Sequence, residues 1–301
     1  MQRLRMAKIV ARMKGGLGNQ LFCYAAARRL AVVSGAELVI DDHTGFIRDH
    51  QYQRRYALDR FAIPCRKADA AERLEPVERL RRGALKFLSR RRAFADRRYI
   101  EQEGLAFDPR LLALRPTGTV YLDGLWQGEG YFKDIEAIIR QDLRIEPPGD
   151  PANLQMSDRI RRQEISVAVH VRWFTGPGAG EADNAAIEYY GDGLALMQAR
   201  MPRAHYFVFS DNPEAARTKL PLPADRFTLV SHNPGDEAAH ADMWLMSQCQ
   251  HFVIANSTFS WWSAWLAANP EKLVVAPRAM PPGGIMEWGF AGQLPDAWIK
   301  L

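Results

Sequence analysis

The stretch Ile165-Ser-Val-Ala-Val-His-Val-Arg172 decides the fold of this chain. Its three valines stand at alternate positions, and β-branched residues with a period of two predict a buried strand. His170 and Arg172 then lie together on the other face, at the carboxyl end of the strand. Ligands of open α/β sheets bind at that end, so an arginine there can hold an anion. The alternative is a strand-end arginine in a surface ion pair.

Strands and helices alternate regularly through the second half of the chain. Predicted strands cover 205–209, 227–230, 251–255 and 273–276, and predicted helices cover 189–200, 213–220, 242–248 and 259–268. This alternation implies a parallel sheet covered on both faces, with sites on the loops that follow the strands. Ser210-Asp211-Asn212 and Asn256-Ser257-Thr258 fall on such loops.

The first half opens with the same pattern. A predicted strand over 8–13 leads into Gly15-Gly16-Leu17-Gly18-Asn19-Gln20 and then into a predicted helix over 21–31. This order lets backbone N–H groups face a phosphate or a sugar. The glycine spacing is neither that of a dinucleotide fingerprint nor that of a P-loop.

Later segments of the first half complete this outline. A strand over 37–40 ends at Asp41-Asp42-His43, which could supply a general base or could simply form a turn and a helix cap. A further strand and aromatic turn cover 121–127, and a helix follows over 131–143. The stiff stretch 146–151, Glu-Pro-Pro-Gly-Asp-Pro, predicts a boundary between two domains, 1–150 and 151–301.

Composition indicates a soluble globular protein. The chain has 301 residues, 47% hydrophobic and 25% charged, which is enough for about two domains. We expect no secretory signal and no membrane span, because charges interrupt the start and no apolar run reaches about 20 residues. Three widely spaced cysteines predict reduced thiols and no structural zinc, as in a cytoplasmic protein.

Positive charge is concentrated in one segment. Residues 79–98 hold nine Arg or Lys and one Asp, whereas the whole chain has a net charge of +5. Leucines and a phenylalanine interleave the segment, so a basic amphipathic helix at the anionic inner face of the cell membrane is one interpretation. The other is a solvated helix face. Nucleic-acid binding is less favoured, because no nucleic-acid motif accompanies the charge.

The loop Asn256-Ser257-Thr258 precedes the apolar run 259–266. Hydroxyls and an amide at a helix N-terminus form an anion site, although Ser and Thr there also cap helices. With Arg172 and Asp211 on neighbouring loops, the expected ligand is a nucleotide diphosphate. No Asp-x-Asp metal motif accompanies them, so arginine and the helix dipole would have to neutralise the diphosphate.

Several ordered motifs resemble those of glycosyltransferase family 11, the α-1,2-fucosyltransferases. They are Gly15-Gly-Leu-Gly-Asn-Gln-Leu-Phe22, Tyr121-Leu-Asp-Gly-Leu-Trp-Gln127, His170-x-Arg172, Phe209-Ser-Asp-Asn212 and Ala255-Asn-Ser-Thr-Phe-Ser-Trp-Trp262. The resemblance covers most of the chain from Lys8 to Ile299.

This resemblance implies an α/β protein of the GT-B type. Two Rossmann-like domains would flank a cleft: an N-terminal acceptor-side domain with the glycine-rich loop and a C-terminal domain that binds GDP-fucose. Fucose would pass with inversion and without a metal to a galactoside hydroxyl, in surface glycan or O-antigen synthesis. No cofactor is implied beyond the donor substrate, and the acceptor would be a galactose-terminated oligosaccharide or glycolipid.

The resemblance also assigns roles to individual residues. Arg172 would hold the β-phosphate with His170 beside it, and Asp211 would read the guanine edge. The remaining positions that would contact donor or acceptor are Gly16, Gly18, Asn19, Asn256, Ser257, Thr258 and Phe259.

One departure bears on the mechanism. The family reads His-x-Arg-Arg-Gly-Asp, whereas this chain has Trp173-Phe174-Thr175 after Arg172, so the usual Asp is missing. Candidate bases are then Asp41, Asp42, His43, Asp183 and Glu188, or no side chain at all. Alternative functions are fucosyl transfer with another linkage, such as α-1,6, and nucleotide-sugar binding with impaired catalysis.

Overall fold

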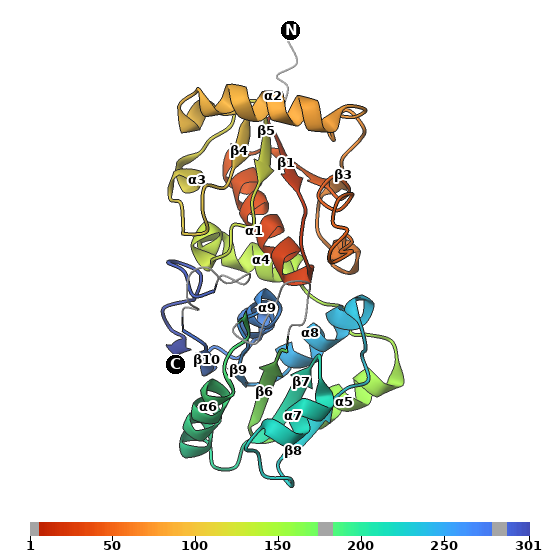
Figure 1. Ribbon diagram of the computed structural model, residues 1–301, viewed down its shortest axis with the longest axis vertical. Coiled ribbons are helices and arrows are strands. Elements are labelled where there is room, and N and C mark those ends of the chain that lie inside the picture. Colours follow the sequence, from red (N-terminus) through yellow and green to blue (C-terminus); the bar gives the residue numbers. More distant parts are fainter. Residues whose placement is uncertain (1–5, 174–182, 279–287) are drawn as a thin grey trace. The chain divides into compact units, whose positions relative to one another are not determined.

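The computed structural model describes residues 6–173, 183–278 and 288–301 (Figure 1). Their contacts divide them into two compact units. The first holds the chain up to Arg144 together with Ala291–Gln293, and the second holds Ile145–Phe290 and Leu294–Leu301. Each unit is built on a sheet of parallel strands, so the predicted pair of Rossmann-like α/β domains is confirmed.

The second unit contains the sheet of order β11-β10-β9-β6-β7-β8. Its strands are β6 (Ser166–Val171), β7 (His205–Ser210), β8 (Phe227–Val230), β9 (His251–Val253), β10 (Val274–Ala276) and β11 (Ile299–Lys300). Its helices are α5 (Pro151–Arg161), α6 (Ile187–Arg200), α7 (Pro213–Lys219), α8 (Ala239–Ser247), α9 (Thr258–Leu266) and the short η6 (Asp236–Ala238). The strands and helices predicted from 165 to 276 are all present, with ends that shift by a few residues.

Strand β6 is the centre of this unit, and it is buried along its whole length. Its valines pack in one apolar cluster with Tyr189 and Leu194 of α6 and Leu220 at the end of α7. From β6 the chain adds β7 and β8 on one side and then crosses to β9 on the other. The sheet therefore has a topological switch point between β6 and β9, which is where ligands bind in such sheets.

The first unit contains the sheet of order β3-β2-β1-β5-β4. Its strands are β1 (Lys8–Arg12), β2 (Glu37–Asp41), β3 (Arg66–Lys67), β4 (Tyr99–Glu101) and β5 (Thr119–Asp123). Its helices are α1 (Leu17–Ser34), α2 (Glu78–Arg90), α3 (Arg110–Ala113) and α4 (Glu136–Asp142), with short turns η1 (Leu58–Arg60), η2 (Phe94–Asp96), η3 (Glu129–Tyr131) and η4 (Lys133–Ile135). Helix α2 runs crosswise to these strands (Figure 1).

Several elements were not expected from the sequence, among them β3, β4 and α5. Strands β3 and β4 have two and three residues, which is too short for a period of two to stand out. Helix α5 begins inside the predicted linker. The Asp150 side chain accepts the N–H of Asn153 at 2.9 Å, and Pro151 opens the helix. Proline is favoured at a first helical position, so the same residues that suggested a linker start a helix.

Candidate active site

His170 lies at the carboxyl end of β6, on the face opposite the valines. Its side chain is buried, and its Nδ1 atom has no hydrogen-bond partner among the residues that the structure describes. Burial, and next the positive charge of Arg172, lower the pKa of His170 to about 3, so the imidazole is neutral at pH 7. An unsatisfied buried polar atom costs roughly 1–3 kcal/mol. That cost is easiest to explain if a ligand completes the hydrogen bonding.

Arg172 follows β6 directly and is half-buried. Its neighbour Trp173 donates its backbone N–H to Asp211 Oδ1 at 2.9 Å, which ties the loop after β6 to the loop after β7. Asp211 is exposed, and this bond occupies one of its carboxylate oxygens. A guanine contact by Asp211 stays a prediction. Phe174 to Gly176 of the departing motif lie outside the described residues.

Helix α9 starts where the chain leaves β9. Ser257 is its N-cap, and the Ser257 hydroxyl accepts the N–H of Phe259 at 3.3 Å. The capping interpretation of Ser257 is therefore confirmed, and ligand contact by its hydroxyl stays a prediction. Thr258 and Phe259 are half-buried in the first turn. Since the N–H groups of a first helical turn lack partners within the helix, this turn favours an anion.

Asn256 clamps the segment that leads into α6. Its Nδ2 donates to the backbone carbonyl of Asp183 at 2.8 Å, and its Oδ1 accepts the N–H of Ala185 at 3.1 Å. Asn256 itself is buried. The nitrogen and the oxygen of the Asn256 amide thus both bond to backbone groups. Asn256 therefore has a structural role, which its position in the sequence motif did not reveal.

The glycine-rich turn of the first unit connects β1 to α1. Gly15 has a φ of 75°, and a Cβ there would come within 2.6 Å of Asn19 Nδ2. This position requires glycine both for its backbone and for the space that Asn19 fills. Gly16 is the N-cap of α1 and offers no side chain to cap it, while Gly18 is buried within the helix.

Asn19 belongs to a chain of amides. Gln127 Nε2 donates to Asn19 Oδ1 at 2.9 Å, and Gln293 Nε2 donates to Gln127 Oε1 at 3.0 Å. Gln293 is fully buried. The amide of Asn19 is thus oriented by residues far away in sequence, and sequence patterns gave no sign of the part that Gln293 plays.

Gln20 holds a second loop against the glycine turn. Its Nε2 donates to the carbonyls of Gly15 at 2.8 Å and Arg55 at 2.9 Å, while its Oε1 accepts the N–H of Ala57 at 2.9 Å. The side chain is fully buried. The polar residue at the end of the motif therefore shapes the turn and is not itself placed for a ligand.

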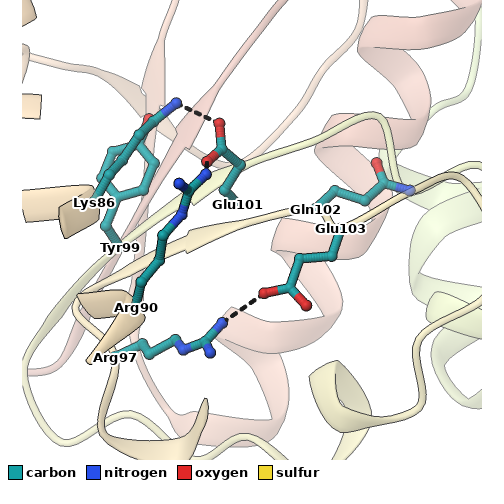
Figure 2. A pocket seen from close by; sticks show the side chains of 7 residues that line it. All are labelled: Lys86, Arg90, Arg97, Tyr99, Glu101, Gln102 and Glu103. Atoms are coloured by element: carbon teal, nitrogen blue, oxygen red, sulfur yellow. Dashed lines mark hydrogen bonds and ion pairs between the residues drawn. The ribbon is translucent and has the colours of Figure 1, made fainter. Parts of the chain in front are cut away.

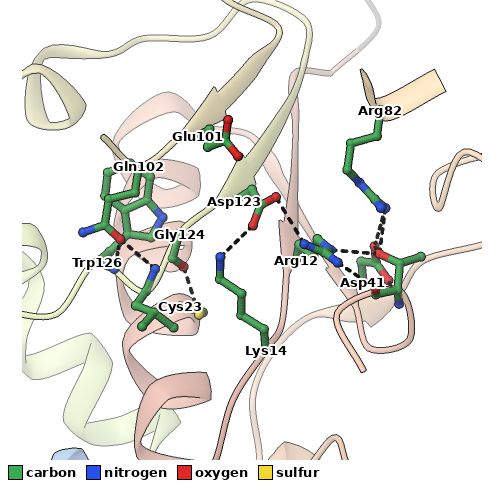
Figure 3. Close-up of polar contacts among 12 residues, drawn as sticks. Arg12, Lys14, Cys23, Asp41, Arg82, Glu101, Gln102, Asp123, Gly124 and Trp126 are labelled. Atoms are coloured by element: carbon green, nitrogen blue, oxygen red, sulfur yellow. Dashed lines mark hydrogen bonds and ion pairs between the residues drawn. The ribbon is translucent and has the colours of Figure 1, made fainter. Parts of the chain in front are cut away.

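A buried carboxylate at the end of β5 gathers positive charge. Asp123 accepts from Lys14 Nζ at 2.9 Å and Arg12 Nη1 at 3.3 Å (Figure 3). It also accepts from the Tyr99 hydroxyl at 2.6 Å. Burial alone would raise the pKa of Asp123, but the charges of Lys14 and Arg12 and the bond from Tyr99 outweigh it and lower the pKa. The sequence motif contains Asp123, but the sequence analysis gave this residue no role. A sign of its importance was available in the sequence, because the strands of this sheet end in charged residues, Arg12 in β1, Asp41 in β2 and Asp123 in β5.

The candidate bases of the first unit differ in their freedom to react. Asp41 is buried and accepts the N–H groups of His43 and Thr44 as well as the Thr44 hydroxyl. This is the turn-forming alternative, and the structure confirms it. Asp42 pairs with Lys67 at 3.4 Å, whereas His43 is exposed.

The candidate bases of the second unit lie around the start of α6. Asp183 is buried, and its backbone carbonyl accepts the hydrogen bond from Asn256. Glu188 is exposed in the first turn of the helix. Among the residues that the structure describes, no group of three or more His, Cys, Asp or Glu side chains could hold a metal ion.

A pocket in the first unit is lined by residues of α2, of β4 and of the chain on either side of β4. Lys86 and Arg90 both pair with Glu101, and Arg97 pairs with Glu103 at 2.9 Å (Figure 2). Each cation of this pocket thus has a carboxylate partner, although the three cations share two carboxylates. This pairing leaves little positive charge for an additional anionic ligand.

Comparison with known proteins identifies a family for this chain. Residues 88–285, more than half of the chain, match glycosyl transferase family 11. A protein of Escherichia coli described as alpha-1,2-colitosyltransferase is 27% identical over 98% of this chain and 99% of its own length. The O-antigen biosynthesis glycosyltransferase WbnK of Escherichia coli is 26% identical over 96% of this chain and 99% of its own length.

Solved structures share the fold. The fucosyltransferase NodZ from Bradyrhizobium superposes with a TM-score of 0.55 at 15% identity, over 90% of this chain and 95% of that one. Arabidopsis thaliana FUT1 in complex with GDP gives a TM-score of 0.51 at 14% identity, over 93% of this chain and 71% of that one. At such identities the likeness shows a common GT-B fold.

Proposed function

Because this chain belongs to glycosyl transferase family 11, we propose that it is an α-1,2-fucosyltransferase that moves fucose from GDP-fucose to a galactoside hydroxyl. The observation that carries the proposal is the neutral imidazole of His170 at the switch point of the second sheet, next to Arg172. Its Nδ1 atom finds no hydrogen-bond partner in the described part of the chain. A diphosphate would meet Arg172 and the first turn of α9 there. Both favour negative charge.

The chemistry needs charge stabilisation more than covalent catalysis. The transition state is oxocarbenium-like, and the departing GDP gathers negative charge as the sugar bond breaks. Arg172 and the α9 dipole would stabilise that charge without a metal, and inversion follows if the acceptor attacks from the opposite face. The glycine turn and Asn19 would serve the acceptor.

A second donor has support from one relative. The chain is 27% identical to a protein described as alpha-1,2-colitosyltransferase, so colitose in nucleotide-activated form is the competing donor sugar. O-antigen synthesis is the proposed setting, because WbnK carries that description.

Turnover of the purified chain tests the proposal. We expect release of GDP from GDP-fucose with a galactose-terminated acceptor, an α-1,2 linkage in the product by NMR, and full activity in excess EDTA. Activity with the nucleotide-activated colitose donor alone would show that colitose, and not fucose, is the sugar transferred. An α-1,6 product, GDP-fucose binding without turnover, or activity that returns only with added magnesium or manganese would each contradict the proposal.

A further inference from the structure

Helix α2 turns its polar side toward the sheet of the first unit. Ser89 is buried and accepts the N–H of Tyr99 at 3.0 Å. Lys86 and Arg90 both reach Glu101 at the end of β4 (Figure 2). Hydrogen bonds and ion pairs therefore hold α2 against the edge of the sheet at β4. Most amphipathic helices of globular proteins instead bury an apolar face against the core.

The opposite side of α2 carries an apolar stripe. It consists of Leu80, Ala84, Phe87 and Leu88, where Phe87 and Leu88 lie three and four residues after Ala84, so that the four share one face. Leu80 is 73% exposed, Phe87 56% and Leu88 55%. Exposed large apolar side chains gathered on one helix mark a surface that binds a partner or a membrane.

Arginines border the apolar stripe. Arg79, Arg81, Arg90, Arg91 and Arg92 are all exposed. The guanidinium of Arg91 lies over the Phe87 ring, 4.0 Å from its centroid. Within the described part of the chain, Arg79, Arg91 and Arg92 have no carboxylate within ion-pair distance. The border is thus cationic, and much of its charge is available to a partner.

We propose that α2 is an interfacial helix that lies on an anionic phospholipid bilayer. The apolar stripe would enter the boundary between headgroups and acyl chains, and the arginines would meet lipid phosphates. A bilayer offers anionic phosphates directly beside apolar acyl chains, which matches arginines beside apolar side chains. A nucleic acid offers phosphates without such an apolar layer. A second copy of this chain would bring arginines against arginines. None of the helices in the described segments has the length and hydropathy to cross a membrane, so binding would be peripheral.

Flotation of the full chain with vesicles tests this proposal, which does not depend on the sugar transferred. We expect binding to vesicles of phosphatidylcholine and phosphatidylglycerol in equal parts, weak binding to phosphatidylcholine alone, and loss at high salt. Leu80→Ser with Phe87→Ser should weaken binding more than about tenfold, because both substitutions remove apolar surface that would be buried in the bilayer. Arg79→Gln, Arg91→Gln and Arg92→Gln should each weaken it about fivefold.

Matched substitutions in the second unit provide the controls. Leu154→Ser with Ile187→Ser removes two other exposed apolar side chains, and Arg162→Gln, Arg200→Gln and Arg217→Gln remove exposed charges. These controls should float like the unchanged chain, and circular dichroism should show every variant folded. Equal binding to neutral vesicles, equal loss in the controls, or a dimer in sedimentation that Leu80→Ser with Phe87→Ser abolishes would overturn the proposal.

Discussion

The imidazole of His170 packs against the ring of Phe259, with ring centroids 5.5 Å apart. This contact joins the end of β6 to the first turn of α9, the two elements on either side of the switch point. Arg172 stands two residues beyond His170, at the same end of the strand. The packing of His170 on Phe259 therefore lies next to both groups proposed to contact the diphosphate, Arg172 and the first turn of α9.

Arg172→Lys should lower kcat/KM by about a hundredfold to a thousandfold, the usual result of removing one transition-state contact. An ammonium cannot grip a phosphate through two parallel N–H bonds as a guanidinium does. Steady-state kinetics with GDP-fucose measure the effect. Arg217→Lys, an exposed arginine of α7, should retain full activity. Kinetics of Arg172→Lys close to those of the unchanged chain would remove Arg172 from the mechanism.

Two buried groups, His170 and Asp242, should make the free energy of unfolding depend on pH in opposite directions. The pKa of His170 is about 3 in the folded chain, against an ordinary value of 6.5 for a histidine in water, so the unfolded chain binds a proton that the fold excludes. Stability from His170 is therefore lost as pH falls from about 6.5 toward 3. Burial raises the pKa of Asp242 from 3.8 to about 7, despite the opposing hydrogen bond from Asn233. The folded chain then holds the extra proton, and stability falls as pH rises from about 4 to 7.

Between pH 4 and 6.5 the contributions of His170 and Asp242 oppose each other. Each group changes the unfolding free energy by up to about 1.4 kcal/mol per pH unit. Burial also lowers the pKa of His205 and His251, so the prediction concerns the change of slope in each variant relative to the unchanged chain. With rising pH, stability should increase less steeply in His170→Phe and more steeply in Asp242→Asn. Urea unfolding at a series of pH values measures the slopes, and a change in the same direction in both variants would contradict this account.

The sequence predicted the second unit far better than the first. Long strands with regular valine or phenylalanine spacing revealed β6 and β7, whose burial on both faces follows from their central places. The order of the first sheet depended on β3 and β4, which are too short to carry a pattern. The basic stretch 79–98 predicted a helix face, but only coordinates show that Ser89 and Lys86 point inward while Leu80 and Phe87 point outward.

Candidate site residues divide in a similar way. Residues that end a strand or begin a helix, such as His170 and Ser257, were placed by local pattern. The tasks of Gln20, Gln293 and Asn256 depend on groups up to 166 residues away along the chain. No local period encodes such pairings, so only the folded chain reveals them.

Gly15→Ala should disturb the glycine turn, because a Cβ there would lie 2.6 Å from Asn19 Nδ2 and the φ of 75° disfavours other residues. Gly35→Ala is the matched control: its φ is 58°, yet apart from the adjacent backbone no described residue comes within 4 Å of the added Cβ. Both should lose stability, roughly 1–2 kcal/mol for the backbone alone. Only Gly15→Ala should also lose turnover. Equal activity in the two variants would mean that the position of Asn19 does not matter to the reaction.

The proton of the acceptor hydroxyl is the subject of the last prediction. A positioned base contributes about 10²–10⁴-fold, yet the usual Asp of the family motif is absent here. We expect the departing β-phosphate oxygen to take the proton, so that Asp42→Ala, His43→Ala and Glu188→Ala each keep turnover within about tenfold.

Asp41 and Asp183 need a separate comparison. Asp41→Ala removes the acceptor of three hydrogen bonds in the Thr44 turn, and Asp183 is buried. In Asp41→Ala and Asp183→Ala, any loss of activity should therefore be accompanied by a lower free energy of unfolding in urea. Asp41→Asn retains an oxygen acceptor but cannot act as a base, and it should recover both stability and turnover. A variant at any of the five positions that folds, binds GDP-fucose and loses turnover by more than about 10³-fold would identify the base and refute proton transfer to the phosphate.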